Sequence, residues 1–161
     1  MTPSSPPAVD AFLAATDALR RVVAGMSREQ LEARPVAGKW STLEVVGHLV
    51  DSEQAWCHRM KRTVAEDRPL LIGYDESKFT ARLNYHAGDL EEELNLLDAM
   101  RRQIARVLRN LSEADWSRTG VHNERGLMTL EEMVAVETEH VLHHVRTIQE
   151  KRRALGLPDA G

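Results

Sequence analysis

The sequence predicts an all-α fold, a four-helix bundle with one long crossover connection between its second and third helices. Only 4% of the residues are aromatic and Ala, Leu, Glu, Arg and Val dominate, a composition that suits helices better than a β-sandwich. Four long stretches repeat apolar residues at steps of three and four, which is the spacing of an amphipathic helix. Some twenty residues, 66–88, separate the second stretch from the third.

The first two helices are expected in the N-terminal half. The first runs from about Ala8 to Ala24, and Gly25 is a plausible stop. The second opens at Ser41, where the letters S-T-L-E predict a capping box, and it continues to about Ala65.

The other two long helices follow the connection. The third begins at Asp89 and runs to about Leu111, and the fourth starts near Thr129 and ends before Gly156. A structureless loop as long as 66–88 is unusual in a domain of this size, so a short helix is possible over Glu76–Leu83. A connection that runs the length of the bundle allows the second and third helices to lie parallel.

A faint internal repeat relates the two halves. The letters M-S-R-E-Q-L-E follow the first helix and L-S-E-A-D-W-S follow the third, and both resemble capped single turns. T-L-E then precedes each next helix, with Thr42–Glu44 and Thr129–Glu131 in matching places. The match predicts two helix–turn–helix halves, and a chance match between common Ser-capped turns is the alternative.

Charge and hydropathy limit the partners. The net charge is −4, whereas a nucleic-acid binder normally carries a basic face, so no nucleic-acid partner is expected. The short basic stretches Arg59–Arg62 and Lys151–Arg153 lie near predicted helix C-termini, where they complement the helix dipole. No apolar run approaches the roughly 18–20 residues that cross a bilayer, so no membrane partner is expected.

We expect one cytoplasmic domain. The whole chain, 1–161, fits the size of a single domain, with residues 1–7 and 155–161 as flexible tails. The N-terminal letters MTPSSPPAVD lack the layout of a signal peptide. The single cysteine, Cys57, cannot form an internal disulfide, so a reducing compartment is expected.

Titratable side chains interrupt the apolar stripe of the fourth helix. Helical geometry places Glu137, His140 and His144 within roughly 60° of one another, on the core side. Burying an unpartnered polar group costs roughly 1–3 kcal/mol. A metal ion compensates histidines, because two of them at i and i+4 point at one site. The alternative is a solvated edge or a hydrogen-bonded core pair.

A further ligand must come from a facing helix, and His48 is the candidate. Its helical phase lies at the edge of the apolar face. Periodicity alone therefore does not decide whether His48 is a ligand or a residue at the boundary of the core. Glu53 lies on the seam of the same helix, where it either orients a ligand histidine or pairs with an arginine such as Arg101. His143 points about 80–100° away from the pair on its helix, which excludes it from the ligand set.

Three segments of the chain carry a family resemblance. They read K-W-S-T-L-E-V-V-G-H-L-V-D-S-E at Lys39–Glu53, G-V-H-N-E-R-G-L-M-T-L at Gly120–Leu130 and H-V-L-H-H-V-R-T-I at His140–Ile148. In this order and spacing they resemble the DinB-like/YfiT-like superfamily of metal-dependent hydrolases, which is related to bacillithiol- and mycothiol-dependent transferases. The resemblance covers nearly the whole chain. Asn123 departs from it, because relatives often have proline there, and the role of His122 stays open.

The resemblance implies a bundle in up-down-down-up order. It implies one divalent metal ion, whether zinc, nickel, manganese or iron, held by His48, His140 and His144. It also implies a homodimer and, for some relatives, a low-molecular-weight thiol as cosubstrate.

Three histidines leave coordination positions open, as catalytic metal sites do. The resulting hypothesis is an enzyme whose metal activates a thiol cosubstrate or water for attack on a small electrophile, as an S-transferase or hydrolase would. Glu137 and Glu53 are the candidate catalytic residues, as a base or as carboxylates that orient a ligand. The alternative is a non-catalytic, metal-binding dimeric bundle with a fourth protein ligand such as Glu137, Glu53 or His122.

Overall fold

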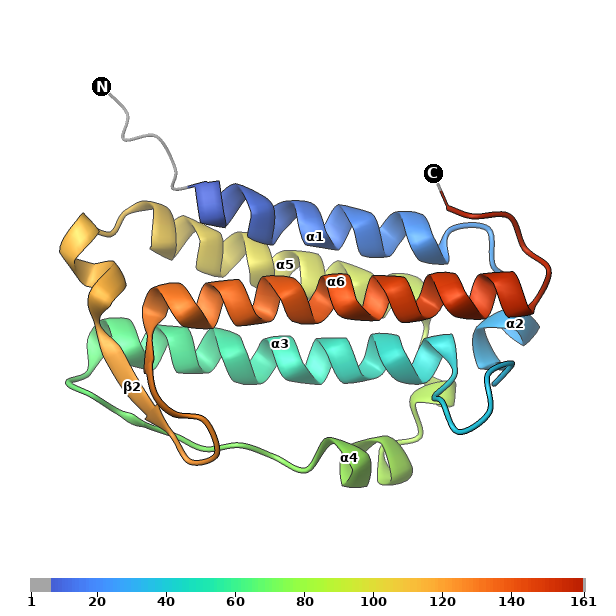
Figure 1. Cartoon of the computed structure of the whole chain (residues 1–161), viewed down its shortest axis with the longest axis horizontal. Coiled ribbons are helices and arrows are strands. Elements are labelled where there is room, and N and C mark those ends of the chain that lie inside the picture. Colours follow the sequence, from blue (N-terminus) through green and yellow to red (C-terminus); the bar gives the residue numbers. More distant parts are fainter. Residues whose placement is uncertain (1–6, 161) are drawn as a thin grey trace.

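Four long helices dominate the computed structural model, which describes residues 7–160 (Figure 1). They agree with the predicted stretches to within about two residues at most ends, the usual scatter of helix boundaries. Within residues 7–160 no helix combines the length and the apolar character needed to cross a bilayer. The four are α1 (Pro7–Val23), α3 (Thr42–Ala65), α5 (Leu90–Arg109) and α6 (Leu130–Ala154).

The helices are arranged in up-down-down-up order. In Figure 1, α1 and α6 run in one direction and α3 and α5 in the other. α1 packs against α6 and α5, and α3 packs against α5 and α6. The connection after α3 returns along the bundle, which is why α3 and α5 are parallel neighbours (Figure 1). The predicted fold class and helix order are confirmed.

The predicted repeat is present at the two capped turns but does not extend beyond them. Ser27 forms a capping box at α2 (Arg28–Glu32), and Ser112 forms one at the 3-10 helix η2 (Glu113–Ser117). The T-L-E letters are offset by one position, because Ser41 caps α3 whereas Thr129 itself caps α6. A β-hairpin separates η2 from α6, and the segment 33–41 between α2 and α3 contains no strand.

A small three-stranded sheet, which the sequence analysis did not predict, lies at one end of the bundle. The strands are β1 (Leu70–Leu71), β2 (Thr119–His122) and β3 (Gly126–Thr129). β2 pairs with β1 in parallel and with β3 in antiparallel fashion, so the sheet ties the connection to the start of α6. Gly126 has φ 77° where the three-residue hairpin loop ends, a conformation that favours glycine.

The connection also contains the short helix that was expected there. α4 spans Glu76–Arg82, is capped by the side chain of Asp75, and lies against α3. None of its side chains is buried. The 3-10 helix η1 (Tyr85–Ala87) follows and also contacts α3. The connection is therefore attached to the bundle through α3 and the small sheet.

A buried ionic network links all four long helices. Arg101 of α5 donates to Glu53 Oε2 of α3 at 2.7 Å and to the carbonyl oxygen of Phe12 in α1 at 2.6 Å. It also donates to the carbonyl oxygen of Glu137 in α6 at 3.3 Å. The side chains of Arg101, Glu53 and Glu137 are all 0% exposed. This network lies between the two apolar clusters of the core.

Residues 155–160 pack against the bundle, which differs from the flexible tail predicted over 155–161. Leu155, Leu157 and Ala160 contact the core cluster around Val141 and Ile148. The guanidinium of Arg152 donates to Pro158 O at 3.0 Å, to Ala24 O at 3.0 Å and to Val22 O at 3.2 Å. The predicted N-terminal tail falls mostly on residues 1–6, outside the described residues, and Pro7 begins α1.

Candidate metal centre

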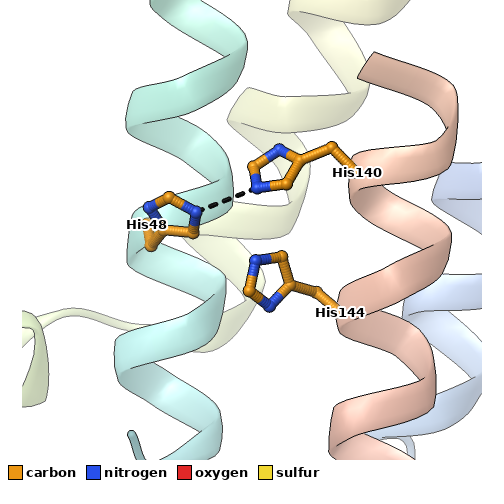
Figure 2. Close-up of side chains that lie close together, drawn as sticks. All are labelled: His48, His140 and His144. Carbon is orange, nitrogen blue, oxygen red and sulfur yellow. Dashed lines mark hydrogen bonds between the residues drawn. The ribbon is translucent and has the colours of Figure 1, made fainter. Parts of the chain in front are cut away.

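The structure brings His48, His140 and His144 together between α3 and α6. Nε2 of His48 lies 3.0 Å from Nε2 of His140, and one nitrogen of each ring points into the space that the three rings share (Figure 2). One candidate ligand atom from each residue lies within 4.8 Å of the others. The ring centroids are 4.8–5.0 Å apart. Helical spacing explains the pair on α6, because residues at i and i+4 lie one turn apart on one face.

Burial keeps these histidines neutral. It lowers the pKa of His48 to about 4, with a further contribution from His140. Burial and the two neighbouring imidazoles lower the pKa of His144 to about 2, and burial lowers the pKa of His140. Neutral imidazole is the form that binds a metal ion.

The donor set fits a divalent ion. Two neutral imidazoles whose Nε2 atoms face each other at 3.0 Å hold at most one hydrogen between them, so at least one lone pair is turned into the shared space. In Figure 2, His144 turns its Nε2 toward His48 and His140, while its Nδ1, on the other side of the ring, is buried and has no hydrogen-bond partner among the described residues. Three imidazole nitrogens converging on one point are typical ligands of zinc, nickel and iron.

Ser52 and Glu137 fix the orientation of His140. Its Nδ1 lies 3.3 Å from Ser52 Oγ and 3.5 Å from Glu137 Oε2, and Ser52 Oγ donates to the same carboxylate oxygen at 3.5 Å. With Nδ1–H donating outward, the lone pair of His140 Nε2 points into the site. The role of Glu137 in orienting a ligand stays a prediction.

Glu53 belongs to the arginine network. Its Oε2 accepts from Arg101 at 2.7 Å, which is the second of the two roles considered for it. Burial raises the pKa of Glu53 to about 7 and that of Glu137 to about 7, while Arg101 opposes both shifts. Both carboxyl groups are 0% exposed, and neither lines the cavity beside the histidines.

A cavity of about 630 Å³ opens beside the histidines. Its wall includes His140 together with Ser52, Trp56 and Arg59 of α3, and Tyr74 and Glu76 of the connection complete that side. Glu76 Oε2 lies 3.7 Å from His48 Nε2, and the Glu76 side chain is 58% exposed. The site therefore has one open side, on which an exposed carboxylate faces a histidine nitrogen.

The remaining histidines of this region lie outside the cluster. His143 is exposed and lines the cavity, with its ring centroid 5.2 Å from that of His144. His122 is buried at the end of β2, where its ring stacks on Trp56 at 5.8 Å. Its Nδ1 accepts from the backbone nitrogen of Glu124 at 3.2 Å, so the hairpin loop holds it in place.

Two residues at this site were not predicted, Glu76 and Arg59. Glu76 reaches His48 through the path of the connection, for which the sequence offered no pattern. Arg59 was grouped with Arg62 as a charge that complements the helix dipole. Arg62 does lie on the surface and donates to Glu66 and Leu70 O, but Arg59 is buried beside the cavity. Arg59 follows His48 by three helical turns, so the assignment of His48 as a ligand already places Arg59 on the same face of the helix.

Similar proteins agree with this description. A relative from Geobacillus thermodenitrificans, named "Putative metal-dependent hydrolase", is 31% identical over 141 residues, which cover 87% of this chain and 79% of the relative. YfiT of Bacillus subtilis, which carries the same description, is 28% identical over 139 residues, covering 86% of this chain and 78% of YfiT.

Two solved structures share the fold. YfiT from Bacillus subtilis, described as a probable metal-dependent hydrolase with an unusual four-helix bundle topology, superposes with a TM-score of 0.88 and 25% identity, over 94% of this chain and 87% of YfiT. A mycothiol-dependent maleylpyruvate isomerase superposes with a TM-score of 0.70 and 13% identity, over 87% of this chain and 58% of the isomerase, which shows the fold alone. The family sequence model of the DinB superfamily matches residues 11–148, and the chain belongs to that superfamily.

Proposed function

We propose that this chain is a metal-dependent enzyme that promotes attack of a water or thiol nucleophile on a small electrophile. The observation that carries the proposal is the convergence of His48, His140 and His144 as neutral ligands beside a cavity of about 630 Å³. Three protein ligands leave a coordination position free, and the cavity gives a small molecule access to it. Relatives named as metal-dependent hydrolases support the same class of chemistry.

A divalent ion held by His48, His140 and His144 would supply a nucleophile at neutral pH, because it would lower the pKa of a water or thiol at the site. The chain's own contribution is orientation and proton transfer. Ser52 and Glu137 hold the His140 ring through its Nδ1 atom. Glu76 is the exposed carboxylate on the open side, and its Oε2 can accept a proton from the nucleophile.

Glu137 and Glu53 are positioning residues in this proposal. Both are completely buried, and neither borders the cavity, so neither can receive a proton directly from a molecule bound there. Glu137 orients His140, and Glu53 holds Arg101, which in turn contacts the backbone of Glu137. The general base predicted among these two residues is reassigned to Glu76.

Metal analysis tests the assignment of the ligands. Purified wild-type protein is expected to carry one divalent ion per chain, and His48→Ala and His144→Ala are each expected to lose most of it on dialysis, because two imidazoles bind far more weakly than three. Plasma mass spectrometry measures the ion. His58→Ala, which removes an exposed histidine of the same helix as His48, is the control and should keep it. Wild-type protein without metal, or ligand variants that keep it in full, would contradict the assignment.

Turnover then defines the reaction. Metal-loaded protein is assayed with water and with each low-molecular-weight thiol against a panel of small electrophiles. Loss of turnover in His144→Ala together with its metal supports the enzyme. A metal-loaded protein that converts none of them supports the second candidate instead.

The second candidate is a non-catalytic bundle that holds a structural metal. Its supporting observation is Glu76, whose Oε2 lies close enough to His48 Nε2, at 3.7 Å, to become a fourth ligand after a small movement. The homodimer implied by the family resemblance stays a prediction and fits either candidate.

Glu76→Gln separates the two candidates. If Glu76 is the base of an enzyme, it is not needed for metal binding. The variant should then keep one ion per chain while turnover falls roughly 10²-fold or more. As the fourth ligand of a structural site, it is required, so the variant should lose metal affinity and thermal stability together. Chelator competition and calorimetry measure both, and Glu139→Gln, an exposed carboxylate bordering the same cavity, is the control.

A further inference from the structure

Arg59 is a buried cation with few partners. The residue is 5% exposed, and no carboxylate lies within 4.0 Å of its guanidinium among residues 7–160. Nη2 donates to the carbonyl oxygen of Ile72 at 2.7 Å, which is its one hydrogen bond within the described part of the chain. A guanidinium has five N–H donors, so most of its donor capacity is unused. Burial lowers the pKa of Arg59, which reflects the cost of holding this charge away from water.

The other buried arginines do not share this property. Arg101 is paired with Glu53 and with two carbonyl oxygens. Arg152 donates to three carbonyl oxygens at the C-terminal ends of the bundle. Because a buried charge is normally paired, the unused donors of Arg59 indicate a partner that comes from outside the chain.

Arg59 faces the same cavity as the metal centre. It follows His48 by three helical turns and about 20° of rotation, so both project from one face of α3 at an axial distance of about 16 Å. Helical side chains lean toward the N-terminus of their helix, which brings the guanidinium back toward the histidines. Both Arg59 and His140 line the cavity.

An aromatic wall accompanies the charge. The Arg59 guanidinium lies 4.7 Å from the centre of the Trp56 ring, and His122 stacks on the same ring. Trp56 also lines the cavity. A cation beside an apolar aromatic surface suits a molecule with an anionic end and an apolar body.

The acidic residues of the cavity lie nearer to solvent. The exposed charged side chains that border it are three carboxylates, Glu76, Glu124 and Glu139, and one cation, Arg125. Water screens all four, whereas Arg59 is desolvated. A ligand with one negative charge can pass these carboxylates more easily than a multiply charged one. The arrangement therefore favours a carboxylate or a sulfonate.

We propose that the cavity binds a carboxylate or sulfonate group of the substrate or cosubstrate on Arg59, with an apolar part of the same molecule against Trp56. The inference rests on the proposed function, because it makes this cavity the substrate site of the metal centre. It selects mono-anionic molecules long enough to reach from Arg59 to the histidines.

Binding of benzoate to chelator-treated, full-length protein tests the proposal without an ion to which the carboxylate could coordinate. Titrations followed by NMR through the indole N–H of Trp56 are expected to show saturable binding of benzoate and weaker binding of the neutral analogue benzamide. Arg59→Gln should weaken benzoate binding at least about tenfold, because a charge-assisted pair is lost. Arg62→Gln, which removes a partly exposed arginine of the same helix that does not line the cavity, should leave it unchanged.

Two further variants keep the outcomes distinct. Arg59→Lys preserves the charge without the planar fork and should bind benzoate with intermediate affinity, which controls for folding of Arg59→Gln. His144→Ala should bind benzoate like wild type although it lacks a metal ligand, so failure of the metal assignment does not imply failure of this one. The proposal is overturned if wild type shows no saturable binding, if it binds benzamide as tightly as benzoate, or if Arg59→Gln binds benzoate as wild type does.

Discussion

Arg101→Met is expected to destabilise the fold by about 3–5 kcal/mol, because it leaves two buried carboxyl groups without their cation. Arg101 bonds to Glu53 and to the backbones of Phe12 and Glu137, so its loss removes contacts from every long helix. Methionine fills much of the same volume, which limits the cost of a cavity. Urea unfolding followed by circular dichroism measures the change in the free energy of unfolding.

The pH dependence of this loss identifies its cause. The folded pKa of Glu53 and of Glu137, about 7, lies above the unfolded value near 4.5. Stability from such groups is fully present below about pH 4.5 and is lost as pH rises through 7. Without Arg101 the carboxyl groups must stay protonated, so the variant should lose more stability at pH 8 than at pH 5.

Arg109→Met is the matched control for this experiment. Arg109 lies on the same helix, is exposed, and pairs with Asp10 at 3.0 Å on the surface. Such pairs contribute about 0–1 kcal/mol, so this variant should unfold almost like wild type. A loss below about 1 kcal/mol in Arg101→Met, or one that does not depend on pH, would show that the network adds little.

Metal affinity is expected to stay nearly constant from pH 7.5 down to about pH 5. Three imidazoles of ordinary pKa, about 6.5, would lose roughly 10⁴-fold in affinity over this range through competition with protons. His48, with a pKa of about 4, and His144, with a pKa of about 2, remain neutral throughout, which leaves His140 to titrate, from a pKa that burial also lowers. With one ligand titrating below the ordinary imidazole pKa of about 6.5, the expected loss is about thirtyfold or less.

Chelator competition between pH 5 and 7.5 measures this affinity for zinc and for nickel. The metal-free protein should behave differently, because its unfolded histidines take up protons below about pH 6.5 while the buried ones do not. Because the pKa values of these histidines are lower in the folded state, their contribution to the free energy of unfolding is present above about pH 6.5. It is lost as the pH falls toward about 4. His58→Ala, which removes an exposed histidine, serves as the control for both measurements. A fall in metal affinity of 10³-fold or more would mean that the three histidines titrate like exposed ones.

Periodicity predicted the long helices and two of the three clustered histidines. His140 and His144 lie one turn apart on an apolar stripe, so their helix alone specifies that they share a site. The helical phase of His48 left its role ambiguous, because the sequence of one helix does not show which neighbouring helix the edge of its apolar face contacts. Its place beside the pair depends on how α3 packs against α6, which the family resemblance implied and the structure shows.

The parts that the sequence did not predict depend on contacts between distant segments. β2 and β3 have four residues each, too few for an alternating pattern to stand out, and β1 has two. Glu76 meets His48 because the connection returns along α3. Arg59 was interpreted together with Arg62 as charge that complements the helix dipole, although one residue of a basic stretch can face the interior while another faces water.

The connection between α3 and α5 has a consequence for how this scaffold can change. α4 contributes Glu76 to the open side of the site, yet none of its side chains is buried. A substitution at Glu76 therefore costs little free energy of folding, while it directly changes the surface that a molecule bound in the cavity contacts. Unlike Trp56 and Arg59, which are buried in the bundle, Glu76 separates ligand preference from fold stability. Substitutions at this one position are therefore expected to change selectivity while the bundle and its histidines stay unchanged.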